Sequence, residues 1–158
     1  MFGNPRFRFP SFHEIQQIVN GYVSSQLSRV NPVILLEYAF GKSQYLLNML
    51  DLENFDIKAF LDRSIAKLTN VLQSNGKKFH TWEPYGNYNK TQLKKENDYV
   101  LIIPNHSMFQ EPYKNLILNG AKMVLLSGKE FMKSFQDKFP SDRYINYSEH
   151  CDYFELKN

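Results

Sequence analysis

The residues with the clearest chemical potential lie between Lys77 and Lys95. This segment contains five lysines, one acid (Glu83) and the only tryptophan of the chain, Trp82. Lysines neutralise phosphates, aromatic rings stack on bases, and amide groups hydrogen-bond to sugars and bases. The segment therefore predicts an RNA-binding loop. Its candidate RNA-binding residues are Lys77, Lys78, Trp82, Tyr85, Asn87, Tyr88, Asn89, Lys90, Lys94 and Lys95. The alternative is a solvated loop in which Trp82 packs into the core and the lysines only keep the surface soluble.

Two further places carry candidate RNA-binding cations. The N-terminal segment before Ser11 contains Arg6 and Arg8 between aromatic residues, and Lys42 follows Gly41. The N-terminal arm could instead be a frayed terminus. The first thirteen residues contain no acid, which weakly resembles an organelle-targeting segment, although a short basic arm is the simpler interpretation.

Three patterns suggest catalysis instead. Ser127 to Lys129 follows a predicted strand and could bind an anion, but it lacks phosphate-loop spacing, and helix capping by Ser127 is the simpler role. The segment from Asp152 to Lys157 imitates the acid-x-Lys element of metal-dependent nucleases, which also need an acid on an adjacent strand. Arg143 and His150 have a spacing found in some helical ribonucleases, although the local pattern predicts a strand. The scattered histidines predict no metal site.

Length and composition indicate one folded domain. The chain has 158 residues, of which 42% are hydrophobic, and its net charge is +3. This charge suits a protein that meets a polyanion on one face. The single cysteine, Cys151, excludes an internal disulfide and a cysteine zinc cluster. We find no apolar run long enough to span a bilayer and no hydrophobic secretory signal, so no membrane contact is expected.

The first half of the chain predicts mainly helices. Ser11 and Glu14 form a capping-box pattern, which predicts a helix over residues 12–27. Residues 33–40 fit either a helix or a strand. Asp56 is expected to cap another helix, which should end at Asn75-Gly76. Its apolar face would consist of Ile57, Phe60, Leu61, Ile65, Leu68 and Leu72, and its polar face of Lys58, Asp62, Arg63 and Lys67.

The second half predicts alternating strands and helices. Strands are expected over residues 99–103, 123–126 and 144–147, and helices over 112–119 and 129–139. Continuous apolar strands indicate burial on both faces, as in a parallel sheet. The predicted fold class is therefore α/β, a three-layer sandwich with a parallel, Rossmann-like sheet and an extra N-terminal helix. We expect an N-terminal arm and helix over residues 1–30 and an α/β RNA-binding domain over 31–158.

Several segments, in collinear order, resemble one protein family. Residues 35–42 resemble its Leu-Leu-Glu-Ala-Gly-Val-His-Phe-Gly-His opening, and Met49-Leu50-Asp51-Leu52 resembles its Ile-Ile-Asp-Leu strand. Residues 82–89 resemble its aromatic-x-Pro-Gly-Thr-Phe-Thr-Asn loop. Further similar stretches are residues 97–103, 121–126 and 143–147. From about Val33 to Tyr153 the chain resembles the second universal small-subunit ribosomal protein, the S-two family.

The departures from that family point to a diverged organellar form. Ser127 to Lys129 replaces the family's Asp-Thr-Asn, residues 148–152 replace its Pro-Gly-Asn-Asp-Asp ending, and the long helical hairpin of the bacterial proteins has no room. The resemblance implies a structural constituent of the mitochondrial small ribosomal subunit that binds rRNA and neighbouring ribosomal proteins. It implies no catalysis, no cofactor and no small-molecule substrate. The alternatives are a small Rossmann-like enzyme or metal-dependent nuclease, possibly phage-encoded, and a non-catalytic inhibitor of one protein partner.

Overall fold

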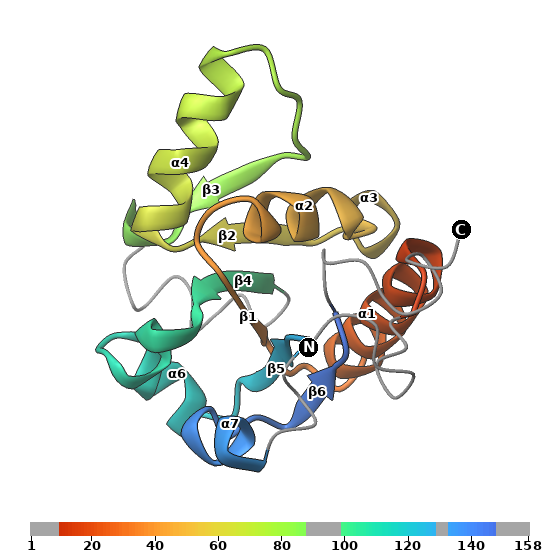
Figure 1. Ribbon diagram of the computed structural model, residues 1–158, viewed down its shortest axis with the longest axis vertical. Helices are drawn as coiled ribbons and strands as arrows, with labels where there is room; N and C mark the ends of the chain where they lie inside the picture. Colours follow the sequence, from red (N-terminus) through yellow and green to blue (C-terminus); the bar gives the residue numbers. More distant parts are fainter. Residues whose placement is uncertain (1–9, 88–98, 129–132, 148–158) are drawn as a thin grey trace, which may run out of the picture.

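The fold is built on a six-stranded, all-parallel sheet with the order β3-β2-β4-β1-β5-β6. It is seen in a computed structural model that describes residues 10–87, 99–128 and 133–147. The strands are β1 (Val33–Glu37), β2 (Lys58–Leu61), β3 (Trp82–Pro84), β4 (Tyr99–Pro104), β5 (Lys122–Leu126) and β6 (Arg143–Ile145). Helices cover both faces, which makes the protein an α/β three-layer sandwich with a Rossmann-like sheet (Figure 1).

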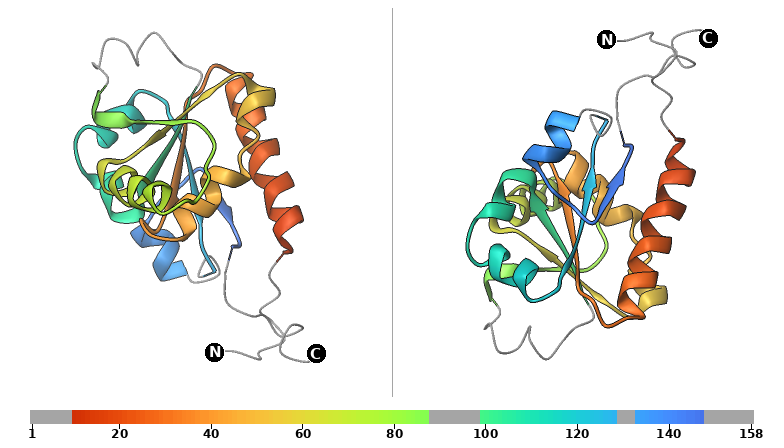
Figure 2. Two further views of the ribbon diagram at one scale, coloured as in Figure 1. Left: turned by 90° about the horizontal axis from the view of Figure 1, so that it is seen from above. Right: turned by 90° about the horizontal axis from the view of Figure 1, so that it is seen from below.

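Alternate residues of each strand enter two separate cores, which we call the first core, under the layer of α1 (Phe12–Leu27), and the second core, on the other face of the sheet. In β1, Val33 and Leu35 face the layer of α1, α2 (Lys42–Met49) and α4 (Arg63–Ser74). Ile34 and Leu36 face the other layer, and Figure 2 shows helices on both sides of the sheet. That layer contains the 3-10 helix η2 (Asn105–Phe109), α6 (Tyr113–Leu118) and α7 (Lys133–Lys138). Because both faces are covered, all of β1 and β4 is buried, and this explains their continuous apolar runs.

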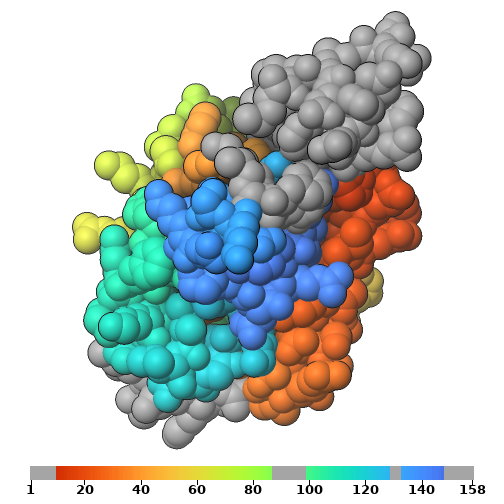
Figure 3. Space-filling view, turned by 60° about the horizontal axis from the view of Figure 1, so that its bottom comes forward, coloured from red at the N-terminus to blue at the C-terminus, as the bar shows by residue number. Residues whose placement is uncertain are grey.

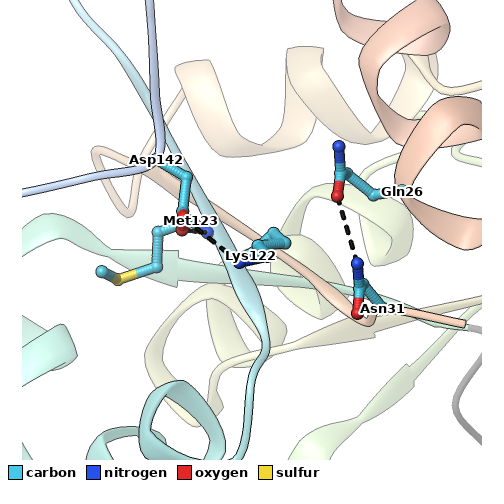
Figure 4. Close-up of polar contacts among 5 residues, drawn as sticks. All are labelled: Gln26, Asn31, Lys122, Met123 and Asp142. Carbon is cyan, nitrogen blue, oxygen red and sulfur yellow. Dashed lines mark hydrogen bonds and ion pairs between the residues drawn. The ribbon is translucent and has the colours of Figure 1, made fainter. Parts of the chain in front are cut away.

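The predicted N-terminal helix is confirmed. In its capping box, the Ser11 N–H donates to Glu14 Oε2 at 2.8 Å and the Glu14 N–H donates to Ser11 Oγ at 3.3 Å. These bonds with Ser11 hold the pKa of Glu14 below its usual range. After the helix ends, the amide of Asn31 donates to Gln26 Oε1 at 3.3 Å (Figure 4). None of the described helices is both long and apolar enough to cross a membrane.

The elements of the second half agree with their predicted positions to within one or two residues. The strands β4, β5 and β6 and the helix α6 are all present. Asp142 fixes the start of β5, since its carboxylate accepts from the Met123 N–H at 2.8 Å and pairs with Lys122 at 3.5 Å (Figure 4). The α7 and β6 segments lie between α6 and α1 on the surface (Figure 3). Of the helix expected over 129–139, the described part is Lys133–Lys138.

The predicted helix beginning at Asp56 is wrong in its first turns. Residues 58–61 form β2, with Ala59 and Leu61 in one core and Phe60 in the other. The short run Lys58–Leu61 fits the apolar face of a helix and a doubly buried strand equally well, so spacing alone cannot distinguish them. The strand that the resemblance assigned to residues 49–52 is also wrong. These residues end α2 and begin α3 (Leu52–Phe55).

Buried tyrosines predict a loss of stability at alkaline pH. Burial raises the pKa of Tyr99 and, together with the hydrogen bond to Asp62, that of Tyr113. Since the unfolded chain loses these protons near pH 10 while the folded protein keeps them, the stabilisation is complete below about pH 10 and is lost above it. Urea unfolding across this range should show stability falling with pH, and Tyr99→Phe should make the fall less steep. Equal slopes for the variant and the wild type would contradict the prediction.

Candidate nucleic-acid interface

The predicted RNA-binding loop follows α4, and hydrogen bonds hold its first part in place. The helix ends at Ser74 with Asn75 as its C-cap, and the next residue, Gly76, has a φ of +85°, a conformation that glycine adopts without strain. The N–H groups of Gly76 and Lys77 donate to the last turn of the helix, to the carbonyls of Gln73 at 2.9 Å and Leu72 at 3.0 Å. This confirms the predicted helix stop and places Lys77 and Lys78 just beyond it, both exposed.

One side chain of α2 holds the turn after α4 in place through two hydrogen bonds. The Asn48 amide donates to the Lys78 carbonyl at 3.1 Å, and its oxygen accepts from the His80 N–H at 3.1 Å. Phe79, between them, packs against the first core. The two lysines are therefore presented from a backbone that is held on both sides, which reduces the entropy lost when they bind a ligand.

Trp82 lies on the edge strand β3, half-buried against the first core. Its indole N–H donates to Gln73 Oε1 on α4 at 3.2 Å. Packing and hydrogen bonding thus give Trp82 a role in joining β3 to α4. This arrangement matches the core-packing alternative for the residue, which stays partly exposed.

Tyr85 does not offer a ring face for stacking. It is only 7% exposed, it packs in the second core, and its ring centroid lies 5.3 Å from that of Tyr113. Burial raises the pKa of its hydroxyl. The predicted contact between Tyr85 and a base is therefore corrected to a core role, because an aromatic ring gains more from burial than from exposure to solvent. The backbone of Asn87 closes the short 3-10 helix η1 (Tyr85–Asn87).

The structure adds α4 itself to this surface, which the loop-centred interpretation missed. Four lysines or arginines and no acid occur between Arg63 and Trp82. Arg63 and Lys67 are exposed on α4 and continue the surface that Lys77 and Lys78 begin. The missed signal was the acid-free run of residues 63–82, which starts upstream of the aromatic loop. We call the exposed residues of α4 with Lys77 and Lys78 the α4 surface.

The surface that joins Trp82 to α3 differs in charge from the α4 surface. A hollow of about 220 Å³ lies there, between α3 and the start of β2 and β3. Its lining includes Glu53, Asp56 and Glu83 against Lys58 and His80. Phosphates would meet carboxylates in this hollow, so the cationic interface ends at Trp82.

Lys42 lies at the opposite end of α2 from Asn48, and therefore away from Lys77 and Lys78. It begins that helix at the carboxyl edge of the sheet, whereas α2 and α4 both end near the amino edge, where Asn48 meets Lys78. Its ammonium lies 5.0 Å from the ring centroid of Tyr147 and 5.8 Å from that of Tyr38, as in cation–π contacts. Lys42 is thus held by aromatic residues and does not extend the α4 surface.

The other predicted RNA-binding residues lie outside the described part of the chain. They are Arg6, Arg8, Tyr88, Asn89, Lys90, Lys94 and Lys95. The same is true of Lys129, His150 and the segment 152–157 that the catalytic alternatives use.

The described part of the carboxyl edge serves to join strands. The Ser127 N–H donates to the Ile145 carbonyl at 3.0 Å, and the Tyr147 N–H donates to the Ser127 carbonyl at 3.4 Å. Within residues 10–87, 99–128 and 133–147, no group of three or more His, Cys, Asp or Glu side chains could hold a metal ion. His13, for example, lies 3.0 Å from the Gln17 amide on its own helix.

Comparison with known proteins adds no relative. A scan against models of protein families gives no match, and neither does a search of curated proteins.

Proposed function

We propose that this protein is a structural, RNA-binding component of the mitochondrial small ribosomal subunit. It binds rRNA and neighbouring ribosomal proteins without catalysing a reaction. The observation that carries the proposal is the acid-free α4 surface, where Arg63, Lys67, Lys77 and Lys78 are exposed on a hydrogen-bonded framework. The collinear resemblance to the S-two ribosomal family supplies the ribosomal context.

The mechanism is docking of a preformed surface onto folded RNA. Several phosphate contacts hold the register of such a complex, and each contributes a salt-dependent share of the affinity. A framework fixed by Gly76, Asn48 and Trp82 needs little rearrangement on binding. This suits a scaffold protein, which must hold one geometry for the life of a particle.

Sedimentation tests the proposal directly. A tagged copy expressed in its own organism should migrate on a sucrose gradient with the small ribosomal subunit of the mitochondrial fraction. Treatment with ribonuclease should move it to the top of the gradient. Sedimentation as a free protein, or co-purification with one stoichiometric protein and no RNA, would contradict the proposal.

A further inference from the structure

One line of exposed side chains runs the length of α4. Arg63, Lys67, Asn70 and Ser74 follow each other at intervals of four, three and four residues, which places them on one face of a helix. All four are exposed, whereas Ile65, Ala66 and Thr69 bury the opposite face. We call this line the α4 stripe; Lys77 and Lys78 continue it beyond the helix.

No acid within the described structure neutralises these cations. Arg63, Lys67, Lys77 and Lys78 make no ion pair within residues 10–87, 99–128 and 133–147. By contrast, Lys122 pairs with Asp142 at 3.5 Å. Asp62, which directly precedes the stripe, is 8% exposed, and its carboxylate accepts from the N–H and the hydroxyl of Ser64. The stripe therefore presents positive charge to solvent.

Helix stability does not explain this arrangement. Arg63 is the first residue of α4, where the helix dipole is positive and a cation is unfavourable. Lys77 and Lys78 follow the C-terminus, where cations are favourable, so their positions alone are less informative. Arg63 works against its own helix, and an anionic ligand would offset that cost.

The shape of the surface suits the backbone of a duplex better than unpaired bases. Splayed bases need exposed aromatic faces or pockets. On α4 the only large exposed apolar side chain is Val71, Trp82 is half-buried and Tyr85 is buried. The hollows that lie around Asp51, Trp82 and Phe55 are lined by residues outside the range 63–74.

The length and chemistry of the stripe also fit a duplex. A helix of 12 residues is about 18 Å long, and even a DNA duplex presents a phosphate about every 1.7 Å of its axis, so several phosphates of a duplex lie within its length. The amide of Asn70 and the hydroxyl of Ser74 lie between the two pairs of cations, and such groups hydrogen-bond to the 2′-hydroxyls of an RNA minor groove. The Ser74 hydroxyl donates to the Asn70 carbonyl at 3.0 Å and keeps its oxygen as an acceptor.

We infer that the α4 stripe, continued by Lys77 and Lys78, binds double-stranded RNA through its phosphates and 2′-hydroxyl groups. This inference rests on the proposed function and specifies which form of RNA the protein recognises. It replaces base stacking by Trp82 and Tyr85 with contacts to the backbone.

The test compares three probes by fluorescence anisotropy at several salt concentrations. They are a mixed-sequence RNA duplex of roughly 20 base pairs, longer than the roughly 16 that a double-stranded RNA-binding domain spans, one of its strands alone, and the DNA duplex of the same sequence. The RNA duplex should bind about tenfold more tightly than the single strand, and more tightly than the DNA duplex.

Three double variants that each remove two positive charges locate the site. Each lost phosphate contact lowers the salt slope by about 0.9, so Arg63→Gln with Lys67→Gln should lower it by about 1.8 and weaken duplex binding roughly tenfold or more at about 0.1 M salt. Lys77→Gln with Lys78→Gln should act similarly. Lys133→Gln with Lys138→Gln is the control, because these exposed lysines lie on α7, at the opposite end of the molecule from α4 (Figure 1). It should change the affinity less than twofold.

The outcomes separate the inference from the proposed function. Equal or tighter binding of the single strand would overturn the duplex assignment, and an equal loss in the control variant would overturn the assignment to the α4 stripe. Both outcomes would leave RNA binding intact. Failure of the wild-type protein to bind any of the RNA probes would overturn both. Because all the changed side chains are exposed, thermal unfolding should be unaltered and excludes misfolding as the cause.

Discussion

Replacing Phe60 with alanine should lower the free energy of unfolding by about 3–5 kcal/mol, the typical cost of truncating a buried aromatic side chain. Phe60 is fully buried in the middle of β2, and its ring meets that of Tyr99 edge-on with centroids 5.6 Å apart. Truncation removes this contact and leaves a cavity between the sheet and the second helix layer. Urea unfolding monitored by circular dichroism measures the change.

The matched control is Phe40→Ala. Phe40 is 65% exposed and lies in the loop after β1, so the same chemical change should cost less than about 1 kcal/mol. A cost for Phe60→Ala no larger than for Phe40→Ala would mean that residues 58–61 do not form the buried strand. Much of the sheet would then be misassigned, because β2 joins β3 to β4.

The architecture was predictable because the apolar runs of β4 and β5 are unbroken. Six residues from Tyr99 to Pro104 are all buried, and such a run has few alternatives to a strand covered on both sides. The start of α1 was predictable for a different reason, since Ser11 and Glu14 form a capping-box pattern that marks the first turn of a helix. These local signals agree with the global fold.

The first strands were not predictable in the same way. β2 has four residues, and the apolar side chains of Phe60 and Leu61 continue into those of Ile65 and Leu68 at helical spacing. Residues 58–61 form a strand because they pair with β4 on one side and β3 on the other. These pairings cannot be inferred from the four residues themselves. Length was similarly uninformative for residues 33–40, where pairing with β4 and β5 decides for β1.

The candidate site shows the same limit. The sequence identifies Lys77, Lys78 and Trp82 as unusual neighbours, but it does not reveal that Trp82 is bonded to Gln73 or that Tyr85 is buried. Both facts depend on where α4 and α6 lie in space. The contribution of Arg63 and Lys67 also becomes visible only when α4 starts at residue 63 and Asp62 turns inward.

Asp62 connects this surface to the opposite helix layer. It caps the N-terminus of α4, where its Oδ1 accepts from the Ser64 N–H at 2.8 Å, and its other oxygen accepts from the Tyr113 hydroxyl on α6. One buried carboxylate therefore fixes the start of the α4 stripe and satisfies a buried hydroxyl across the edge of the sheet.

Asp62→Ala should therefore be the most destabilising change at a polar residue of this region. Losing the cap costs about 1 kcal/mol, and leaving the Tyr113 hydroxyl buried without its acceptor costs about 1–3 kcal/mol, which together predict a loss of about 2–4 kcal/mol. Asp137→Ala, on the exposed side of α7, is the matched control and should stay within about 0.5 kcal/mol.

A double-mutant cycle with Tyr113→Phe isolates the link between the layers. Once Asp62 is alanine, removing the hydroxyl should relieve part of the loss, so the double variant should be more stable than the sum of the single changes predicts, by about 1 kcal/mol or more. Strict additivity would show that the Asp62–Tyr113 bond is absent in solution. If Asp62→Ala cost no more than Asp137→Ala, the result would indicate that Asp62 lies on an exposed helix face, as the sequence pattern suggested. The α4 stripe would then have no defined beginning at Arg63.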